Sequence, residues 1–245
     1  TLDSFVLKTT IFTKRAFIFA VNGYGRLDTL QIRRITMIEN SYSDFFELQE
    51  NELEYLDYRI IVHHRNPDIA VLAIHGGNIE PGTSEVAAAL GERLCASTYL
   101  FEGLKPRGNQ VLHIPSRLFN EPSGVSMAAN AQTTLSIHGH YDVHNGLVYI
   151  GGRNEPYKNL IQQCLNKAGF QTDHAPQHLS GMNGNNITNT SKTGAGVQLE
   201  LSTKLRKSFF KGDDFTSKNR VNHCNLLKRF VTAIEKATLE YKQVE

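Results

Sequence analysis

The amino-acid sequence predicts an α/β fold, and three observations support this prediction. Short apolar runs typical of strands alternate with amphipathic windows typical of helices along residues 41–245. Polar side chains follow directly after two of the apolar runs, as they do at strand ends in open α/β sheets. A chain of 245 residues is also long enough to bury a sizeable core in one domain and to carry an appendage.

The expected elements follow one another in a regular order. Each expected strand is an apolar run, and each expected helix repeats apolar residues at helical spacing. Gly169 is placed to end the second helix as a C-terminal cap. The expected strands are 58–63, 69–74, 99–102, 133–138, 147–150 and 197–201, and the first two expected helices are 84–95 and 155–168.

A last amphipathic helix is expected at the end of the chain, after the loop rich in Gly and Asn at 180–196 and the strand that follows it. Apolar residues recur there at a spacing that places them on one helical face. These residues are Val221, Cys224, Leu227, Val231, Ile234 and Tyr241.

Residues 1–40 fit no core pattern, because short apolar runs alternate there with Lys and Arg. We interpret them as an N-terminal extension whose order the sequence does not define, either an appended hairpin, a disordered leader or a translation artefact. The apolar stretch 16–21 is too short to span a membrane, and Lys8, Lys14 and Arg15 interrupt any signal sequence. We therefore expect a cytoplasmic protein, or one released without a classical signal peptide, and no membrane anchor.

Charge and cysteine content favour an ordinary soluble enzyme or binding protein. Twenty-six basic and 24 acidic side chains give a formal charge of +2, which provides no electrostatic case for binding nucleic acid or an anionic membrane. Cys95, Cys164 and Cys224 stand far apart in apolar helical contexts, and no two of them form a metal-binding pair. We expect all three to be reduced core residues.

The first motif that carries chemistry is HGGNIEPGTSE, which begins at His75. An apolar strand runs directly into His75, and two glycines allow a sharp turn, so the imidazole and the carboxylate of Glu80 can converge on one point. This geometry suits a divalent metal. The simpler alternative is that His75 caps the strand through a hydrogen bond and that Glu80 is a solvated loop acid.

A second strand ends in His138, at the same expected edge of the sheet. Zinc in hydrolases is commonly held by two histidines and one carboxylate, with a fourth position open to water, and His75, Glu80 and His138 supply such a set. His140 and His144 are rivals of His138 as the third ligand. The remaining histidines are interpreted as structural or surface residues: His63, His64, His113, His174, His178 and His223.

The third motif is the strand GVQLELS, in which Gln198 and Glu200 face away from the apolar side chains. A glutamate within a strand must lie in a cleft, pair with a base such as Arg206, or approach a metal. Zinc hydrolysis needs three ligands that lower the pKa of a water and a separate carboxylate that takes its proton. Together, His75, Glu80, His138 and Glu200 match this chemistry, with Glu200 as the separate carboxylate.

In their order along the chain, the segments HGGNIEPGTSE, LSIHGHYD, YIGG, NNIT and GVQLELS resemble the poly-γ-glutamate hydrolases of bacteriophages and their bacterial relatives. The resemblance extends from about Ser41 to Phe210. It implies a zinc-carboxypeptidase-like core with a mixed sheet flanked by helices, and a zinc hydrolase domain over 41–245. It also implies zinc ligands at His75, Glu80 and His138, Glu200 as catalytic acid/base, and cleavage of γ-linked glutamyl amides.

One departure from the family concerns substrate recognition. Such enzymes carry a basic residue soon after the segment that contains Asn186, whereas this chain continues with Thr188-Asn189-Thr190. Arginine is the usual bidentate partner of a carboxylate. We expect the substrate to contact Asn186 together with Arg153 and Arg206, and the alternatives are Lys105 and Arg117.

Two other functions remain open from the sequence, since a fold does not determine a function. An amidohydrolase acting on small N-acyl amino acids would use the same metal site with a narrower pocket. A catalytically inactive protein that binds carboxylates or glycans would keep the fold and the zinc but cleave no amide.

Overall fold

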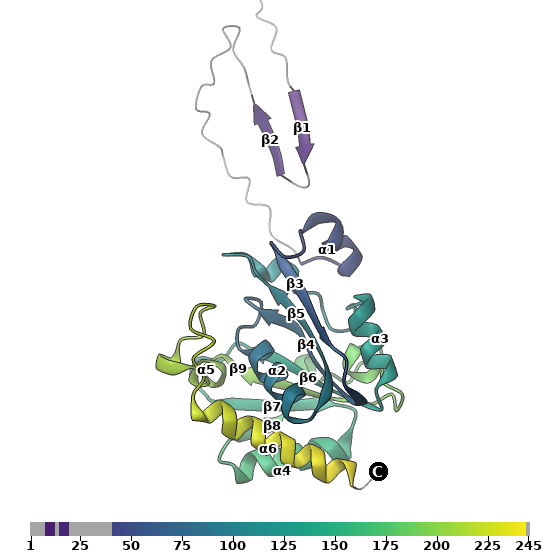
Figure 1. Ribbon diagram of the computed structural model, residues 1–245, viewed down its shortest axis with the longest axis vertical. Coiled ribbons are helices and arrows are strands. Elements are labelled where there is room, and N and C mark those ends of the chain that lie inside the picture. The colour runs from purple at the N-terminus through teal and green to yellow at the C-terminus, as the bar shows by residue number, and fades with distance from the viewer. Residues whose placement is uncertain (1–7, 13–14, 20–40, 244–245) are drawn as a thin grey trace, which may run out of the picture.

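The computed structural model describes residues 8–12, 15–19 and 41–243, and its main feature is a seven-stranded sheet (Figure 1). The strand order is β3-β5-β4-β6-β9-β7-β8, with β3 antiparallel to β5 and β7 antiparallel to β9, while the other pairs are parallel. The predicted α/β class and the mixed sheet are therefore confirmed. The strands are β3 Tyr58–His63, β4 Asn66–Gly77, β5 Ala96–Gly103, β6 Thr133–His140, β7 Leu147–Gly152, β8 Gln171–His174 and β9 Val197–Ser202.

Helices cover both faces of this sheet. One face packs on α2, α4 and α6, and the other packs on α1 and α3. The helices are α1 Phe45–Asn51, α2 Thr83–Arg93, α3 Pro122–Asn130, α4 Glu155–Lys167, α5 Thr203–Ser208 and α6 Asn225–Lys242. Short 3-10 helices occur at η1 Asn109–Leu112, η2 Gln177–Leu179, η3 Ile187–Asn189 and η4 Lys211–Asp213.

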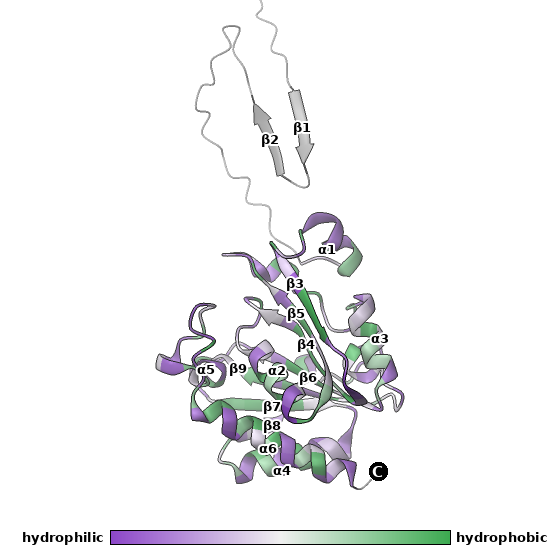
Figure 2. Ribbon diagram, in the orientation of Figure 1, coloured by the Kyte–Doolittle hydropathy of each residue, from purple (hydrophilic) through white to green (hydrophobic). Residues whose placement is uncertain are grey.

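The alternation of side chains along the central strand produces two cores. In β4, Val71 and Ala73 face α2 and α6, whereas Leu72 and Ile74 face α3, and all four are fully buried. Hydrophobic residues, green in Figure 2, accordingly run along the central strands and the inner stripes of α4 and α6. A parallel strand buried on both faces reads as a continuous apolar run, which is why the sequence predicts β4 correctly.

The C-terminal cap of α4 is as expected, but the start of the last helix is not. Asn154 accepts a hydrogen bond from the backbone N–H of Tyr157, and Gly169 follows the helix with φ 84°. The last helix begins at Asn225, so Val221 lies in a turn and is 78% exposed. Its apparent helical spacing was coincidental, because the periodicity of the packed face starts only with Leu227.

Cysteine placement also differs in part from the prediction. All three cysteines are unpaired, but Cys95 is exposed and Cys224 is half-buried, so only Cys164 is a core residue. Cys95 has φ 50° just beyond the end of α2, where the chain turns towards β5. Its apolar sequence context reflects the neighbouring helix rather than its own burial.

The N-terminal residues that the structure describes form a separate hairpin. β1 Lys8–Phe12 and β2 Arg15–Phe19 pair antiparallel as a two-stranded sheet of their own. The other residues of 1–40 lie outside the described part of the chain, so the division at residue 40 stays a prediction. Within the described residues, no helix has both the length and the apolar character that crossing a membrane requires.

Candidate metal centre and catalytic site

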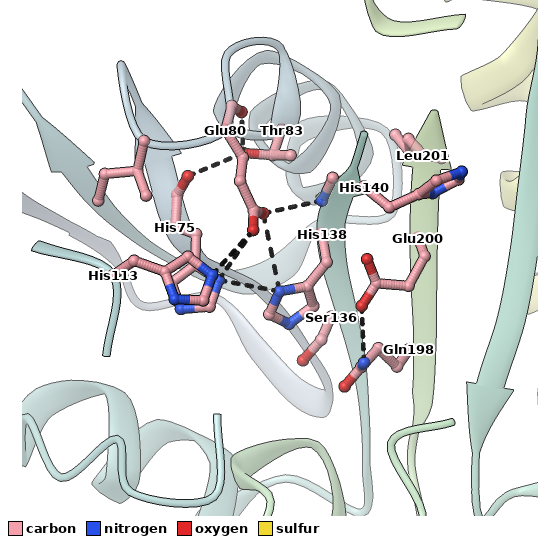
Figure 3. A network of polar contacts seen from close by, with 12 residues as sticks. His75, Glu80, Thr83, His113, Ser136, His138, His140, Gln198, Glu200 and Leu201 are labelled. Atoms are coloured by element: carbon pink, nitrogen blue, oxygen red, sulfur yellow. Dashed lines mark hydrogen bonds and ion pairs between the residues drawn. The ribbon is translucent and has the colours of Figure 1, made fainter. Parts of the chain in front are cut away.

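A cavity of about 930 Å³ opens where β4, β6 and β9 reach their carboxyl ends, as expected for an α/β sheet. His75, Glu80, His138 and Glu200 all line it, although they are far apart in sequence. Figure 3 shows Glu80 directed towards the histidines, and Glu200 on the neighbouring strand. The convergence expected from the two strand-end histidines is therefore present.

The glycines after His75 make the sharp turn possible. A Cβ on Gly77 would lie 2.5 Å from the carbonyl oxygen of Gly103, and Gly77 has φ 63°. The turn returns the backbone N–H of Glu80 to the carbonyl of His75 at 2.9 Å, and Thr83 Oγ1 donates to the carbonyl of Glu80 at 2.9 Å. The Glu80 side chain is thus held beside the His75 ring, whose Nδ1 is 3.3 Å from Glu80 Oε1.

The donor atoms of this cluster fit a divalent metal. His75 Nε2 lies 2.7 Å from the carbonyl oxygen of Ile114, which can only accept, so Nε2 carries the proton and Nδ1 keeps its lone pair. His138 Nδ1 lies 3.2 Å from His75 Nδ1 and 3.8 Å from Glu80 Oε2. Two imidazole nitrogens and a carboxylate that converge in this way match the ligand set of zinc hydrolases, and the Ile114 carbonyl fixes one ring as an outer partner.

Burial sets the protonation of the two histidines. Desolvation lowers the pKa of His138 to about 3, with a further contribution from His75. Desolvation also lowers the pKa of His75, assisted by His113. Both rings are therefore neutral at physiological pH, which is the state that a metal ligand needs.

His113 is the residue of this cluster that the sequence interpretation missed. Its ring stacks on His75 with centroids 3.7 Å apart, and its Nε2 lies 3.2 Å from Glu80 Oε1. His75, Glu80 and His113 lie close enough to one another to hold one ion. Burial lowers the pKa of His113, but the hydrogen bond and charge of Glu80 outweigh burial and raise it. The available signal was its position between Leu112 and Ile114, both fully buried.

Glu200 lies across from His138 in the register of β6 and β9, and it is only 5% exposed. Burial, followed by the negative charge of Glu80, raises the pKa of Glu200 well above its ordinary value. Gln198 Nε2 donates to Glu200 Oε1 at 2.8 Å. Of the three environments expected for this carboxylate, the structure therefore places it in a cleft.

Arg206 does not form an ion pair with Glu200 among the described residues. Its guanidinium instead donates to the backbone carbonyls of Leu201 at 3.1 Å and Pro81 at 2.8 Å, and Arg206 itself is 5% exposed. A Cβ on Gly139 would lie 2.5 Å from the Arg206 Cζ atom. This arginine therefore connects the segments that contain Leu201 and Pro81 by hydrogen bonds, and it does not line the cavity.

Only some of the other expected substrate contacts line the cavity. Asn186 lines the cavity, but Arg153 does not, since its Nε donates to the carbonyl of Met182 at 2.8 Å. Lys105 binds Glu52 away from the site. Arg117 is exposed, lines the cavity and makes no hydrogen bond to the residues that the structure describes.

The rival histidines also reach the cavity without joining the cluster. His140 and His144 both line it, and the His140 ring packs against Tyr149 with centroids 4.9 Å apart. In Figure 3 the His140 ring points away from Glu80 and His138, as the alternation of a strand requires. His178 also lines the cavity, as an exposed surface residue.

Comparison with known families gives a match over residues 42–233 to the family model described as poly-gamma-glutamate hydrolase. The chain belongs to this family. Its sequence is 42% identical over 177 residues to YndL of Bacillus subtilis, covering 70% of this chain and 68% of YndL. It is 38% identical over 184 residues to YmaC of the same organism, covering 74% of this chain and 76% of YmaC.

Solved structures agree with this assignment. The chain matches a bacteriophage poly-gamma-glutamate hydrolase with TM-score 0.82 and 35% identity, over 83% of this chain and 99% of the phage enzyme. It matches a zinc-free structure of YndL with TM-score 0.75 and 37% identity, over 80% of this chain and 96% of that one. The family and the fold class predicted from the sequence motifs are therefore confirmed, and both indicate a hydrolase.

Proposed function

We propose that this protein is a zinc-dependent hydrolase that cleaves γ-glutamyl amide bonds, with poly-γ-glutamate as its substrate. The observation that carries the proposal is the convergence of two neutral histidines, one carboxylate and a separate buried glutamate on one cavity. Membership of the poly-gamma-glutamate hydrolase family supports the choice of substrate. The zinc-free state described for the YndL structure supports the choice of metal.

His75, Glu80 and His138 are the proposed zinc ligands. The atoms that they direct to one region are the Nδ1 lone pair of His75, the Nδ1 atom of His138 and the Glu80 oxygens. Zinc held there would supply Lewis acidity for the scissile carbonyl and lower the pKa of a water molecule. His113, which donates to Glu80, is proposed to orient this carboxylate as an outer partner.

Glu200 is the proposed acid and base of the reaction. A general base works best when its pKa lies near the working pH, and burial beside Glu80 raises the pKa of Glu200 in that direction. As a carboxylate it would accept a proton from the attacking water, and as the resulting acid it would return that proton to the departing amine. The apolar strand around it, including Leu199 and Leu201, excludes bulk water from one side.

Substrate recognition requires a partner for the α-carboxylates of a γ-linked glutamyl chain. Arg117 is proposed for this role, because it is the guanidinium that the described cavity lining presents without an intramolecular partner. A cavity of about 930 Å³ lies within the range of natural ligand sites and accommodates more than one glutamyl residue. Arg153 and Arg206 are already engaged with backbone carbonyls.

The decisive experiment combines metal analysis of the purified protein with incubation of the zinc-loaded enzyme with poly-γ-glutamate. We expect about one zinc per chain. We also expect the polymer to become shorter, which gel filtration measures. Turnover of N-acyl amino acids without polymer cleavage would favour the small-substrate amidohydrolase. Zinc binding without cleavage across a panel of amides would favour a carboxylate- or glycan-binding protein of the same fold.

A further inference from the structure

A line of three buried side chains leads from the loop beside the cavity to Glu200. Asn186 Oδ1 accepts from the backbone N–H of Thr188 at 2.9 Å. Asn186 Nδ2 donates to Gln198 Oε1 at 3.0 Å, and Gln198 Nε2 donates to Glu200 Oε1 at 2.8 Å. Asn186, Gln198 and Glu200 are each no more than 6% exposed, so water competes little for these bonds.

The polarity of this line is fixed at its far end. A backbone N–H can only donate, so the Asn186 atom that faces Thr188 is the carbonyl oxygen, and its amide nitrogen faces Gln198. The Gln198 atom that accepts from it must then be the carbonyl oxygen, which leaves Nε2–H directed at Glu200. One peptide group thus determines that Glu200 Oε1 acts as an acceptor.

We propose that Gln198 and Asn186 form a relay that positions Glu200 for catalysis by occupying its Oε1 and leaving Oε2 to exchange the proton. Among the residues that the structure describes, Oε2 has no hydrogen-bond partner, and Glu200 faces the cavity. The inference rests on the proposed hydrolase function. It makes Gln198 and Asn186 positioning residues, and it replaces the expected substrate contact of Asn186 with a structural role towards the base.

The loop that covers Gln198 is shaped to hold its amide. Gly181 has φ 63°, and a Cβ there would lie 2.9 Å from Gln198 Oε1 and 3.0 Å from its Cδ. Gln198 Nε2 also lies 3.3 Å from the carbonyl of Leu179, on the same loop. The Gln198 amide is therefore held between this loop and β9, and Asn186 Nδ2 determines which way it faces.

The first test removes the donor and keeps the volume, as Gln198→Met. We expect kcat on poly-γ-glutamate to fall about 10- to 100-fold, as is usual for outer partners of catalytic groups, while KM and zinc content stay near wild type. An unchanged kcat in zinc-loaded protein overturns the inference. A raised KM with unchanged kcat also overturns it, because Gln198 would then contact substrate.

The second test is designed to turn over the Gln198 amide while Glu200 is left unchanged. In Asn186→Asp, the new carboxylate oxygen attracts the Gln198 amide nitrogen, so Gln198 turns its carbonyl towards Glu200 and repels the ionised base. We expect kcat to fall at least as far as in Gln198→Met. Adding Asn186→Asp to Gln198→Met is expected to cause no further loss, whereas independent, multiplicative effects would overturn the relay.

The matched control is Asn189→Asp, the same change in a neighbouring buried asparagine of the loop. Its Nδ2 donates to the carbonyls of Gly181 and Asn183, and its Oδ1 accepts from Gly196, so it supports the loop without contacting Gln198. We expect a lower melting temperature with a much smaller change in kcat per folded molecule. Equal kcat losses in Asn189→Asp and Asn186→Asp would show that loop stability alone is responsible.

A readout independent of turnover separates failure of the relay from failure of the proposed function. In ¹⁵N-labelled protein, the Gln198 side-chain amide protons should be shifted downfield and exchange slowly, and Asn186→Asp should displace these resonances while Asn189→Asp leaves them in place. Unmoved resonances in Asn186→Asp overturn the relay. Displaced resonances in a protein that cleaves no γ-glutamyl amide would retain the relay and reject the hydrolase.

Discussion

Two glutamates on the same cavity have opposite electrostatic environments, although both are buried. Burial acts to raise the pKa of Glu80, but the neighbouring imidazoles, first that of His75 and then those of His113 and His138, hold it well below its ordinary value. Burial raises the pKa of Glu200 well above its ordinary value, and the charge of Glu80 raises it further. The same type of side chain thus favours the ionised state at Glu80 and the protonated state at Glu200.

This difference in pKa indicates that the two glutamates have different roles in the cavity. A carboxylate with a depressed pKa stays ionised and suits a metal ligand, whereas a carboxylate with a raised pKa suits reversible proton transfer. The residues around each carboxylate cause this difference in pKa. Glu80 faces imidazoles, while Glu200 lies across from His138 and Tyr149 on the flanking strands and accepts from one amide donor.

The largest expected effect comes from making the same change at both carboxylates. Glu200→Gln should lower turnover about 10²- to 10⁴-fold or more, because it removes the base, while zinc remains stoichiometric. Glu80→Gln should lower turnover by losing the metal. Single-turnover rates and zinc content measured on the same samples check both expectations.

A purely structural Glu200 predicts a different result. If it only supported the fold, Glu200→Gln would change the melting temperature and leave the rate of each folded, zinc-loaded molecule near normal. That outcome would remove Glu200 from the mechanism and abolish the contrast with Glu80.

The next largest effect concerns which histidine completes the metal set with His75 and Glu80. His138→Ala should abolish stoichiometric zinc, because it removes an Nδ1 donor 3.2 Å from that of His75. His113→Ala should keep zinc but weaken its affinity about 10- to 100-fold, as expected for an outer partner of Glu80. Competition with a chromophoric chelator measures both. Loss of zinc in His113→Ala with retention in His138→Ala would exchange the two roles.

A smaller effect is expected on substrate affinity. Arg117→Ala should raise KM for poly-γ-glutamate about tenfold or more with little change in kcat, since a hydrogen-bonded charge pair contributes about 1.5–3 kcal/mol. Arg153→Ala is the matched control, because Arg153 donates to the Met182 carbonyl and does not itself line the cavity. Equal KM values for wild type and Arg117→Ala would place substrate recognition elsewhere.

The sequence was informative about the parts of the site that lie on strands. An apolar strand followed by a histidine can be recognised from the chain alone, so His75 and His138 were found, and alternation within β9 placed Glu200 on the cavity side. His113 was not assigned to the site, and Arg117 was named only as an alternative to Arg153 and Arg206. Both lie in the long connection after β5, where no periodicity tells which way a side chain points.

The same limit explains the errors in the fold. The elements missed by the sequence analysis, α1, α3, β8 and α5, are short, and short windows carry little periodic signal. Arg206 was expected to meet substrate because free arginines often bind carboxylates. Its true partners are backbone carbonyls of Leu201 and Pro81, which only the packed loops bring to it.

The contrast between the two glutamates also predicts opposite effects on the stability of the zinc-free protein. The folded-state pKa of Glu200 lies above its unfolded value, so its stabilising contribution is complete at low pH and is lost as pH rises through the folded pKa. Glu80 has a depressed pKa, so its contribution is present above the unfolded value and is lost as pH falls through the folded one.

At neutral pH, zinc-free Glu200→Gln should therefore melt above wild type and zinc-free Glu80→Gln below it. Each pKa unit corresponds to about 1.4 kcal/mol, and each kcal/mol to about 2–4 °C for a domain of this size. Melting curves of the chelated proteins at several pH values measure the difference, which should shrink towards acid for both variants. Shifts of the same sign in both variants at neutral pH would contradict the assigned environments.

The smallest effect is expected from removing residues 1–40, because both glutamates and their partners come from elements that follow. β1 and β2 pair with each other, and the seven-stranded sheet consists of strands between Tyr58 and Ser202. Truncation at a terminus is tolerated when little buried backbone is lost, so zinc content and cooperative unfolding should stay at the level of the full chain.

A deletion only slightly longer provides the control for this truncation, since it removes α1. Phe45 is 4% exposed and Leu48 is fully buried, and the Phe45 ring lies 6.1 Å from that of Tyr58 and 6.3 Å from that of Phe101. Losing two buried side chains of this size costs several kcal/mol, about 2–5 for each, so removal of residues 1–51 should unfold or strongly destabilise the domain. Melting temperature and zinc content of the two truncated proteins locate the domain boundary. If deletion of residues 1–40 alone lowers the yield of soluble, zinc-binding protein, the first 40 residues are part of the domain that supports the two glutamates.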